Sequence, residues 1–488
     1  MESILVPRQK ASTLPYGIAI IGGGFSGAMV LANLVRHAAA PLRIAWFEPH
    51  EFAEGAAYRT NHIEHLLNVR AERMGAFVGE AGHFLRWLGA PAGQAALAQF
   101  WPGQAVTGET YMPRRIYAAY LQDILAQTLE RAPASNVDIT RRKAMVTDLI
   151  PHPGGGAITV SYETGNGAQQ IEVQAVVLAT GNLPPRKTSF QRAETEDYVH
   201  DVWRAGSQFP AETVSRLGPQ DKVVLIGTGL TMIDMVQTLK AQGFTGHITA
   251  ISRHGLIPRP QHHGIAYPSW AWVQAPHEAP QTVLGLLVRL KQEMRDAIAQ
   301  GFGWQSVIES IRPVTRDLWE RLPEEERKKF SKRLATFWSI HRHRMSPFVH
   351  SQILRFVTEN HLRLVAGKIA SVSGQDGKLT VTWRNGKQIE TLQARLVLNC
   401  TGPNHDASIG DSTLLQRLLA RGLIETHPAG GIRVTSDSLA RGAQQAKIFP
   451  MGALLVGEFL ESTAVPEIRD QAGRIAAILL RESQHFSQ

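Results

Sequence analysis

The chain of 488 residues contains a single cysteine, Cys400. This count excludes an internal disulfide, a Cys-x-x-Cys redox pair and a cysteine-rich metal site. Long hydrophobic runs are also absent, because the longest apolar runs, such as AVVLA and RLVLNC, are far shorter than the roughly 20 residues that span a bilayer. We therefore expect no membrane span, no metal site and no dithiol chemistry within the chain.

The composition is that of a globular protein, with 43% hydrophobic and 19% charged residues. The length fits two or three domains. The formal charge of +9 comes from dispersed Lys and Arg residues, without a nucleic-acid-binding motif. A basic surface that attracts anionic cofactors and substrates is the favoured interpretation, with no nucleic-acid partner. The first residues lack the pattern of a signal peptide, so we expect a cytoplasmic protein.

The first nucleotide motif follows the apolar run at 17–21. It is Gly22-Gly23-Gly24-Phe25-Ser26-Gly27, and the next residues have helical periodicity. In such a strand, turn and helix, the first glycine makes the turn, the second admits a pyrophosphate and the third lets helix and strand pack closely. The helix start supplies N–H donors to the phosphates. We expect contacts to a dinucleotide from Gly22, Gly24, Phe25, Ser26 and Gly27.

The next apolar run, at 42–47, ends in Glu48, which lies 21 residues after Gly27. A carboxylate at about this distance holds a ribose 2′-OH and repels a 2′-phosphate. Glu48 therefore predicts FAD or NAD at this motif.

A second motif follows the apolar run at 222–226. Its residues are Gly227-Thr228-Gly229-Leu230-Thr231-Met232, so methionine replaces the third glycine. The following strand ends in Ser252-Arg253, where an acid would select NAD. A hydroxyl and a guanidinium suit a 2′-phosphate, which predicts NADPH; the alternative is a solvated arginine. The contacts expected at this site come from Gly227, Gly229, Leu230, Thr231, Ser252 and Arg253.

The sequence repeats its plan after each motif. Alternating residues at 144–173 lead into a strand that ends in Thr180-Gly181, and those at 362–391 lead into one that ends in Thr401-Gly402. Both ends lie where parallel strands terminate, so we expect these four residues beside a cofactor. Cys400 is interpreted as a small buried strand residue. The predicted fold is α/β, with two Rossmann-like dinucleotide-binding domains of the three-layer ββα type and a helical insert.

The expected domain boundaries follow from this repeat. Residues 1–200 form the N-terminal part of the FAD-binding domain, 201–394 the NADPH-binding domain with a helical insert at 275–360, and 395–488 the C-terminal part of the FAD-binding domain. The insert contains Arg342 and Arg344 in the stretch HRHRMSP. These arginines predict either an anion pocket for a carboxylate-bearing substrate or cofactor phosphate, or a solvated basic helix end.

The chain resembles the FAD/NAD(P)-binding oxidoreductase family, bacterial flavoproteins related to the flavin-containing and N-hydroxylating monooxygenases. The resemblance covers nearly the whole chain and rests on GGGFSG, HLLNVRAERM, HFLRWL, MPRR, GTGLTMID, ISRHGLIPRP, HRHRMSP and EFLESTAVPEIRDQAGRIA. It implies that Asn68, Arg70 and Met74 lie beside the flavin, with Asn68 as the catalytic residue; the alternative is that Asn68 caps a loop. It also implies that Gly452, Ser462 and Thr463 belong to the segment that closes over the flavin.

The resemblance implies an FAD-dependent, NADPH-reduced monooxygenase that oxygenates an amine nitrogen through a flavin hydroperoxide. The substrate would be a small molecule, for which an amino acid is one candidate, and the second substrate molecular oxygen. Two alternatives stay open, namely an NAD(P)H-dependent flavin reductase that passes electrons to a partner protein or quinone, and a redox-sensing flavoprotein without turnover. Whether the chain forms a homo-oligomer also stays open.

Overall fold

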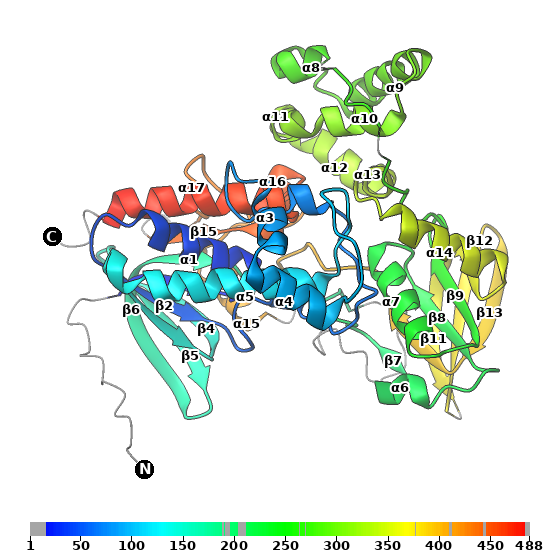
Figure 1. Cartoon of the computed structure of the whole chain (residues 1–488), viewed down its shortest axis with the longest axis horizontal. Helices are drawn as coiled ribbons and strands as arrows, with labels where there is room; N and C mark the ends of the chain where they lie inside the picture. The colour runs from blue at the N-terminus through cyan, green and yellow to red at the C-terminus, as the bar shows by residue number, and fades with distance from the viewer. Residues whose placement is uncertain are drawn as a thin grey trace.

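The structure is a computed structural model that describes residues 16–187, 190, 196–203, 211–262, 264–268, 270–375, 377–408, 412–442 and 446–483. Two sheet domains lie side by side, and a group of helices projects beyond them (Figure 1). The mixed α/β architecture confirms the predicted fold class.

The first domain is built on a mostly parallel sheet. The strand order is β3 (Val137–Arg142), β2 (Leu42–Phe47), β1 (Tyr16–Ile21), β6 (Gly167–Leu178), β5 (Ile158–Thr164) and β4 (Met145–Pro151). Strands β4 to β6 form an antiparallel meander. The end of β6 also pairs in parallel with β15 (Lys447–Pro450), a strand that follows the second domain in the sequence.

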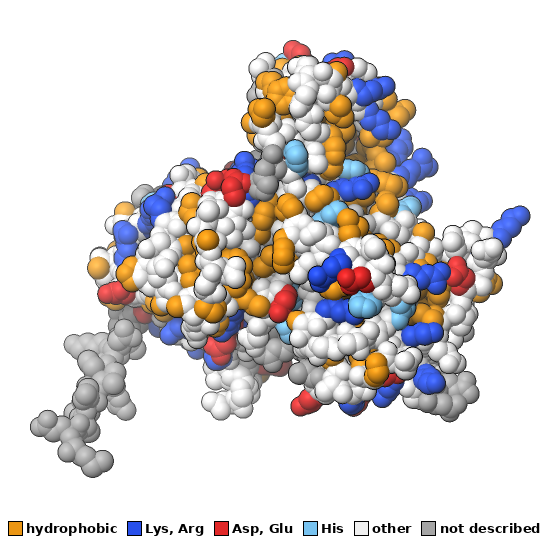
Figure 2. Space-filling model, turned by 45° about the vertical axis from the view of Figure 1, so that its right-hand side comes forward, with side chains coloured by type: hydrophobic (Ala, Val, Ile, Leu, Met, Phe, Trp, Pro, Cys, Tyr) orange, Lys and Arg blue, Asp and Glu red, His pale blue; other side chains and the backbone are white. Residues whose placement is uncertain are grey.

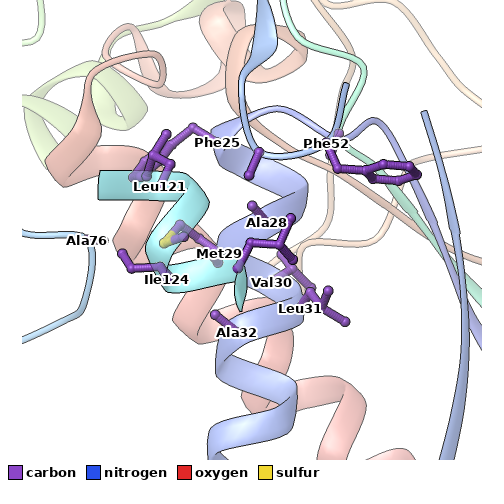
Figure 3. Packing of buried hydrophobic residues seen from close by; sticks show 14 of the residues in the cluster. Phe25, Ala28, Met29, Val30, Leu31, Ala32, Phe52, Ala76, Leu121 and Ile124 are labelled. Atoms are coloured by element: carbon purple, nitrogen blue, oxygen red, sulfur yellow. The ribbon is translucent and has the colours of Figure 1, made fainter. Parts of the chain in front are cut away.

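Helices cover one face of this sheet. The strands β1 and β2 are therefore buried along almost their whole length. The helices are α1 (Phe25–His37), α5 (Arg114–Arg131) and the last helix α17 (Val465–Ser483), which together share one core with the strands. Figure 3 shows Met29 of α1 beside Leu121 and Ile124 of α5. The meander and α15 (Thr413–Ala420) form a second core on the other face. Shorter helices complete the domain: α2 (Gly55–Tyr58), α3 (His83–Gly89), α4 (Pro91–Phe100) and α16 (Val456–Phe459).

The second domain repeats the plan. Its parallel sheet has the order β10 (Leu362–Ala366), β9 (His247–Ser252), β8 (Lys222–Ile226), β14 (Leu396–Asn399) and β7 (Tyr198–Val199). Helices α7 (Leu230–Ala241) and α14 (Pro347–Thr358) pack on one face. On the other face lies the antiparallel meander of β11 (Lys368–Gln375), β12 (Lys378–Asn385) and β13 (Gln388–Ala394). A short helix, α6 (Ala211–Ser215), precedes β8.

The observed strands correct the expected domain boundaries. Strand β14 pairs with β8, and β7 pairs with β14, so both strands belong to the second domain rather than to the segments 395–488 and 1–200. The expected insert at 275–360 is also too long at its end, because α14 packs on the second sheet through Val349, Ile353 and Phe356. Helical periodicity predicts the helix but not the core in which it is buried.

The helical insert itself comprises α8 (Ala271–Gln274), α9 (Val283–Ala299), α10 (Trp304–Ser310), α11 (Thr315–Arg321), α12 (Glu324–Arg333) and α13 (Ala335–Arg342). It stands at the top of Figure 1, above the junction of the two domains. Its buried side chains form a core of their own, and Trp319 Nε1 donates a hydrogen bond to Gly457 O at 2.8 Å. The insert therefore rests on the C-terminal part of the first domain.

Candidate functional site

Two glycines of the first motif, Gly22 and Gly27, have no room for a side chain. Gly22 has φ +111°, and a Cβ there would lie 2.1 Å from Ala179 O. A Cβ on Gly27 would lie 2.0 Å from Gly22 O, because α1 packs closely on the turn that leads into it. Gly24 is the N-cap of α1 and has no side-chain cap. The helix thus begins with N–H groups that suit an anion such as a pyrophosphate.

Glu48 lies beside this turn, at the end of β2. Its carboxylate accepts hydrogen bonds from the backbone N–H of Gly23 at 2.7 Å and from that of His50 at 2.9 Å. These bonds hold a half-buried negative charge next to the glycine motif. The position fits the expected contact to a ribose hydroxyl, which stays a prediction.

The C-terminal segment reaches the same motif. A Cβ on Gly452 would lie 3.2 Å from Ser26 Oγ, so the two residues are neighbours. The Gly452 N–H donates to Gln471 Oε1 at 2.8 Å, and Gln471 Nε2 donates to Ser462 O at 3.3 Å. Gln471 therefore holds the two parts of the segment together, a role that the sequence did not reveal.

Two hydroxyl groups of this region have buried oxygens without a hydrogen-bond partner among the described residues. They are Ser462 Oγ and Thr180 Oγ1, and the Ser462 side chain is almost fully buried. Buried polar atoms in proteins are normally paired. The two unpaired hydroxyls and the glycine turn fit a polar cofactor such as FAD. The third hydroxyl expected here, that of Thr463, belongs to an exposed residue. Gly181 has φ +72°, which lets the chain turn away at the strand end.

The residues expected beside the flavin ring lie on one loop with different surroundings. Asn68 is half-buried, and its backbone oxygen accepts a hydrogen bond from Gln261 Nε2 at 3.0 Å. Met74 is buried, and its backbone oxygen accepts from Tyr117 Oη. Arg70 forms ion pairs with Glu72 and Glu109. The charge of Arg70 is thus balanced within the protein, and the catalytic role of Asn68 stays a prediction.

The second glycine motif reproduces the first turn. Gly227 has φ +112°, and a Cβ there would lie 2.4 Å from Cys400 O. Gly229 is the N-cap of α7, without a side-chain cap, and a Cβ there would meet nothing within 4 Å. The helix start with Leu230 and Thr231 is partly accessible, while Met232 is fully buried in the core. This geometry offers N–H donors to a second dinucleotide phosphate.

The two residues expected to select NADPH lie at the end of β9 and have different surroundings. The Ser252 hydroxyl lies 2.8 Å from Thr228 Oγ1 and accepts from the Gly255 N–H at 3.1 Å, so it is held by the loop. Arg253 is exposed, and among the described residues its guanidinium makes one long contact, of 3.5 Å, to Thr336 Oγ1. Its guanidinium is thus accessible to a ligand phosphate.

Around the second motif, burial raises the pKa of the Cys400 thiol far above its usual range, which agrees with the interpretation of a strand residue. Thr401 follows and donates to Asn399 Oδ1 at 2.8 Å, and Gly402 has φ +85°.

The structure corrects the expected anion pocket in the insert. Arg342 is buried and forms a two-pronged ion pair with Glu461. Arg344 is 2% exposed and pairs with Glu309. Both guanidinium groups are therefore buried beside carboxylates of the protein and do not form two open forks, although Arg344 Nε and Nη1 have no hydrogen-bond partner among the described residues. These partners lie 119 and 35 residues away in the sequence, which no local pattern reveals.

The two domains are joined by contacts that the sequence did not indicate. Arg114 Nη2 lies 2.8 Å from Asp234 Oδ2 of α7. His65 is fully buried; its Nδ1 lies 2.9 Å from Thr60 Oγ1 and its Nε2 lies 2.8 Å from Thr238 Oγ1. Burial lowers the pKa of His65 to about 4. The junction therefore contains a histidine that stays neutral at pH 7.

The helices of the described residues include none with the length and hydropathy of a membrane span. In the same part of the chain, no group of three or more His, Cys, Asp or Glu side chains is arranged to hold a metal ion.

One family model matches the N-terminal part of the first domain. Residues 19–183 match the model of a family described as FAD-NAD(P)-binding. No curated protein matches the chain.

Solved structures share the fold over almost the full length. One is the ornithine N-hydroxylase of Kutzneria sp. 744, solved with reduced FAD, NADP+ and L-ornithine (TM-score 0.64, 14% identity, 96% of this chain and 100% of that chain). Another is L-lysine 6-monooxygenase of Pseudomonas syringae (0.62, 15%, 96% and 99%). A third is the bacillithiol disulfide reductase of Staphylococcus aureus (0.56, 12%, 97% and 100%). At these identities the similarity shows the arrangement of two Rossmann-type domains.

Proposed function

We propose that this protein is an FAD-dependent monooxygenase that is reduced by NADPH and oxygenates an amine nitrogen of a small molecule. The observation that carries the proposal is the pair of glycine cradles, one next to the carboxylate of Glu48 and the other next to the accessible guanidinium of Arg253. An acid suits FAD and a guanidinium suits the 2′-phosphate of NADPH. The shared fold with ornithine and lysine monooxygenases supports the same chemistry.

Several groups around the first glycine motif would hold FAD. The N-terminus of α1, Glu48 and Ser462 would bind the phosphates, the ribose and a polar edge of FAD. Bound FAD would supply electron transfer from NADPH to oxygen. The half-buried Asn68 would position the substrate nitrogen or the flavin edge by its amide, which donates and accepts hydrogen bonds without being acidic.

An NAD(P)H-dependent reductase that passes electrons to a partner protein or quinone is the second candidate, because the fold is shared with a disulfide reductase. Reduction of a disulfide by a dithiol of this chain is excluded, since Cys400 is its only cysteine.

The test measures coupled consumption of NADPH and oxygen by the FAD-loaded protein in the presence of amines, with ¹⁸O₂ and mass spectrometry of the product. A monooxygenase incorporates one labelled oxygen atom per NADPH oxidised. A protein that reduces quinones or electron-transfer partners rapidly, without labelled product from any amine, contradicts the proposal. A protein that does not bind FAD contradicts both candidates.

A further inference from the structure

A large cavity lies inside the helical insert, outside the two glycine motifs. Its volume is about 970 Å³, at the upper end of the roughly 300–1,000 Å³ found for small-molecule sites. Apolar side chains from α9 to α13 form most of the wall, among them Leu287, Met294, Ile308, Leu318, Leu334 and Trp338. Figure 2 shows hydrophobic side chains gathered on the insert at the top of the view. Apolar side chains that face open space forgo packing contacts, and an apolar ligand would supply these contacts.

The cavity reaches the nucleotide-binding domains at its base. Pro260 lines it, and the next residue, Gln261, donates the hydrogen bond to Asn68 O. Leu460 also lines it and is followed by Glu461 and then by the buried Ser462. Two segments that contact the expected flavin site therefore also form part of the chamber wall.

The ionisable side chains that line the cavity are all basic. The ionisable side chains in its lining are Arg259, Lys291, His341 and His350, and no carboxylate of the described residues lines it. Burial, reinforced by Arg259, lowers the pKa of His350. The lysine and the arginine of the lining, Lys291 and Arg259, are both exposed. These two cations disfavour a short dication and favour an anionic substituent, and solvent and salt screen both effects.

We propose that this cavity binds the apolar body of the substrate, so that the enzyme acts on an elongated hydrophobic amine whose remote end is neutral or anionic. The inference rests on the proposed monooxygenase function and adds the substrate class. The amine would lie at the base near Asn68, and the hydrocarbon part would lie between α9 and α13. Short polar amines such as ornithine, lysine and cadaverine would leave most of the volume unfilled.

The test compares 12-aminododecanoate with 6-aminohexanoate, dodecylamine and cadaverine on the FAD-loaded enzyme. Each buried methylene contributes about 0.8 kcal/mol, so kcat/KM is expected to rise by up to about fourfold per methylene. Cadaverine is expected to be the poorest substrate, and 12-aminododecanoate better than dodecylamine. Isothermal titration calorimetry of 12-aminododecanoate gives a second readout that does not depend on oxygenation.

Variants of α9 locate the binding. Leu287→Trp and Met294→Trp fill the cavity and are expected to weaken binding of 12-aminododecanoate by about tenfold or more, with little effect on 6-aminohexanoate. The matched control is Val288→Trp, since Val288 is the next residue of the same helix, is 55% exposed and does not line the cavity. FAD content and melting temperature verify that each variant is folded.

The outcomes separate the two proposals. Long-chain binding that Leu287→Trp abolishes, without labelled product from any amine, supports the chamber and contradicts the monooxygenase. Oxygenation of cadaverine or 6-aminohexanoate, with no binding of the long chains, supports the monooxygenase and overturns the chamber. Equal loss of binding in Val288→Trp and Leu287→Trp also overturns the chamber, because the effect then comes from disturbance of the helix.

Discussion

Arg342 and Glu461 form a buried ion pair that fastens the helical insert to the segment carrying Ser462. Arg342 Nε lies 2.7 Å from Glu461 Oε1, and Nη2 lies 2.8 Å from Oε2. The side chains are 8% and 9% exposed. Because the two parallel hydrogen bonds are shielded from solvent, they fix one orientation of the guanidinium. The pair therefore orients the base of the cavity relative to the first domain.

Removing one partner of this pair is expected to destabilise the protein. Glu461→Ala leaves a buried guanidinium without a counter-charge, which costs about 3–5 kcal/mol. The double variant Arg342→Met with Glu461→Leu is expected to recover most of this loss. Urea denaturation followed by tryptophan fluorescence measures both.

The control for this prediction is Glu359→Ala, because Arg355 and Glu359 form an exposed pair at 3.8 Å. Such a pair contributes about 0.5 kcal/mol or less. A loss in Glu461→Ala as small as in this control would contradict the structural role of the buried pair.

Arg253 is expected to select NADPH. Arg253→Ala should raise KM for NADPH by about 10- to 100-fold and leave KM for NADH nearly unchanged, because a hydrogen bond to a charged group contributes about 1.5–3 kcal/mol. Steady-state kinetics with both nucleotides measures the effect. The matched control is Arg363→Ala, since Arg363 is an exposed arginine at the opposite end of the same sheet. Equal changes for both nucleotides would refute the assignment.

The two glycines of the second motif are expected to have different roles, Gly227 in folding and Gly229 in nucleotide binding. A Cβ on Gly227 meets Cys400 O at 2.4 Å and requires a positive φ, so Gly227→Ala is expected to lower the free energy of unfolding by about 3 kcal/mol or more. A Cβ on Gly229 meets nothing within 4 Å. Gly229→Ala should therefore fold normally but bind NADPH more weakly, because the methyl group occupies the approach of the pyrophosphate. Thermal unfolding and nucleotide titration distinguish the two, and normal NADPH binding by Gly229→Ala would argue against this phosphate site.

The domain junction is expected to make stability depend on pH. The pKa of His65 is about 4 in the folded protein, below its ordinary value of 6.5, because of burial. The unfolded chain therefore binds a proton more readily, so stability falls as the pH drops from 6.5 toward 4. The full loss from this residue is roughly 3 kcal/mol, at about 1.4 kcal/mol per pKa unit.

Burial also lowers the pKa of His343 and of His427 to about 4, and they shift stability in the same direction. The contribution of His65 is therefore measured as the difference between the wild-type protein and His65→Gln in urea midpoints at pH 7 and pH 4.5. Identical pH profiles for the two proteins would contradict it.

The sequence predicted the elements that local patterns encode. Glycine spacing located both turns because Gly22 and Gly227 must adopt a positive φ against a neighbouring backbone oxygen. The boundary near 395 was wrong because the alternation in this stretch predicts a strand without showing which sheet includes it. The arginines of the insert could not be assigned correctly, since their partners Glu461 and Glu309 are brought to them by tertiary packing. The cavity has no motif of its own, because its walls come from several amphipathic helices.

The late position of β15 and α17 has a consequence for how the protein is made. Both elements complete the first domain, by pairing with β6 and packing on α1, yet they are synthesised after the entire second domain. Before β15 and α17 have been synthesised, the first domain therefore lacks one strand and one helix. At that stage all strands of the second domain's sheet have already been translated. The glycine cradle and Glu48 are thus synthesised long before the strand and the helix that complete the domain around them.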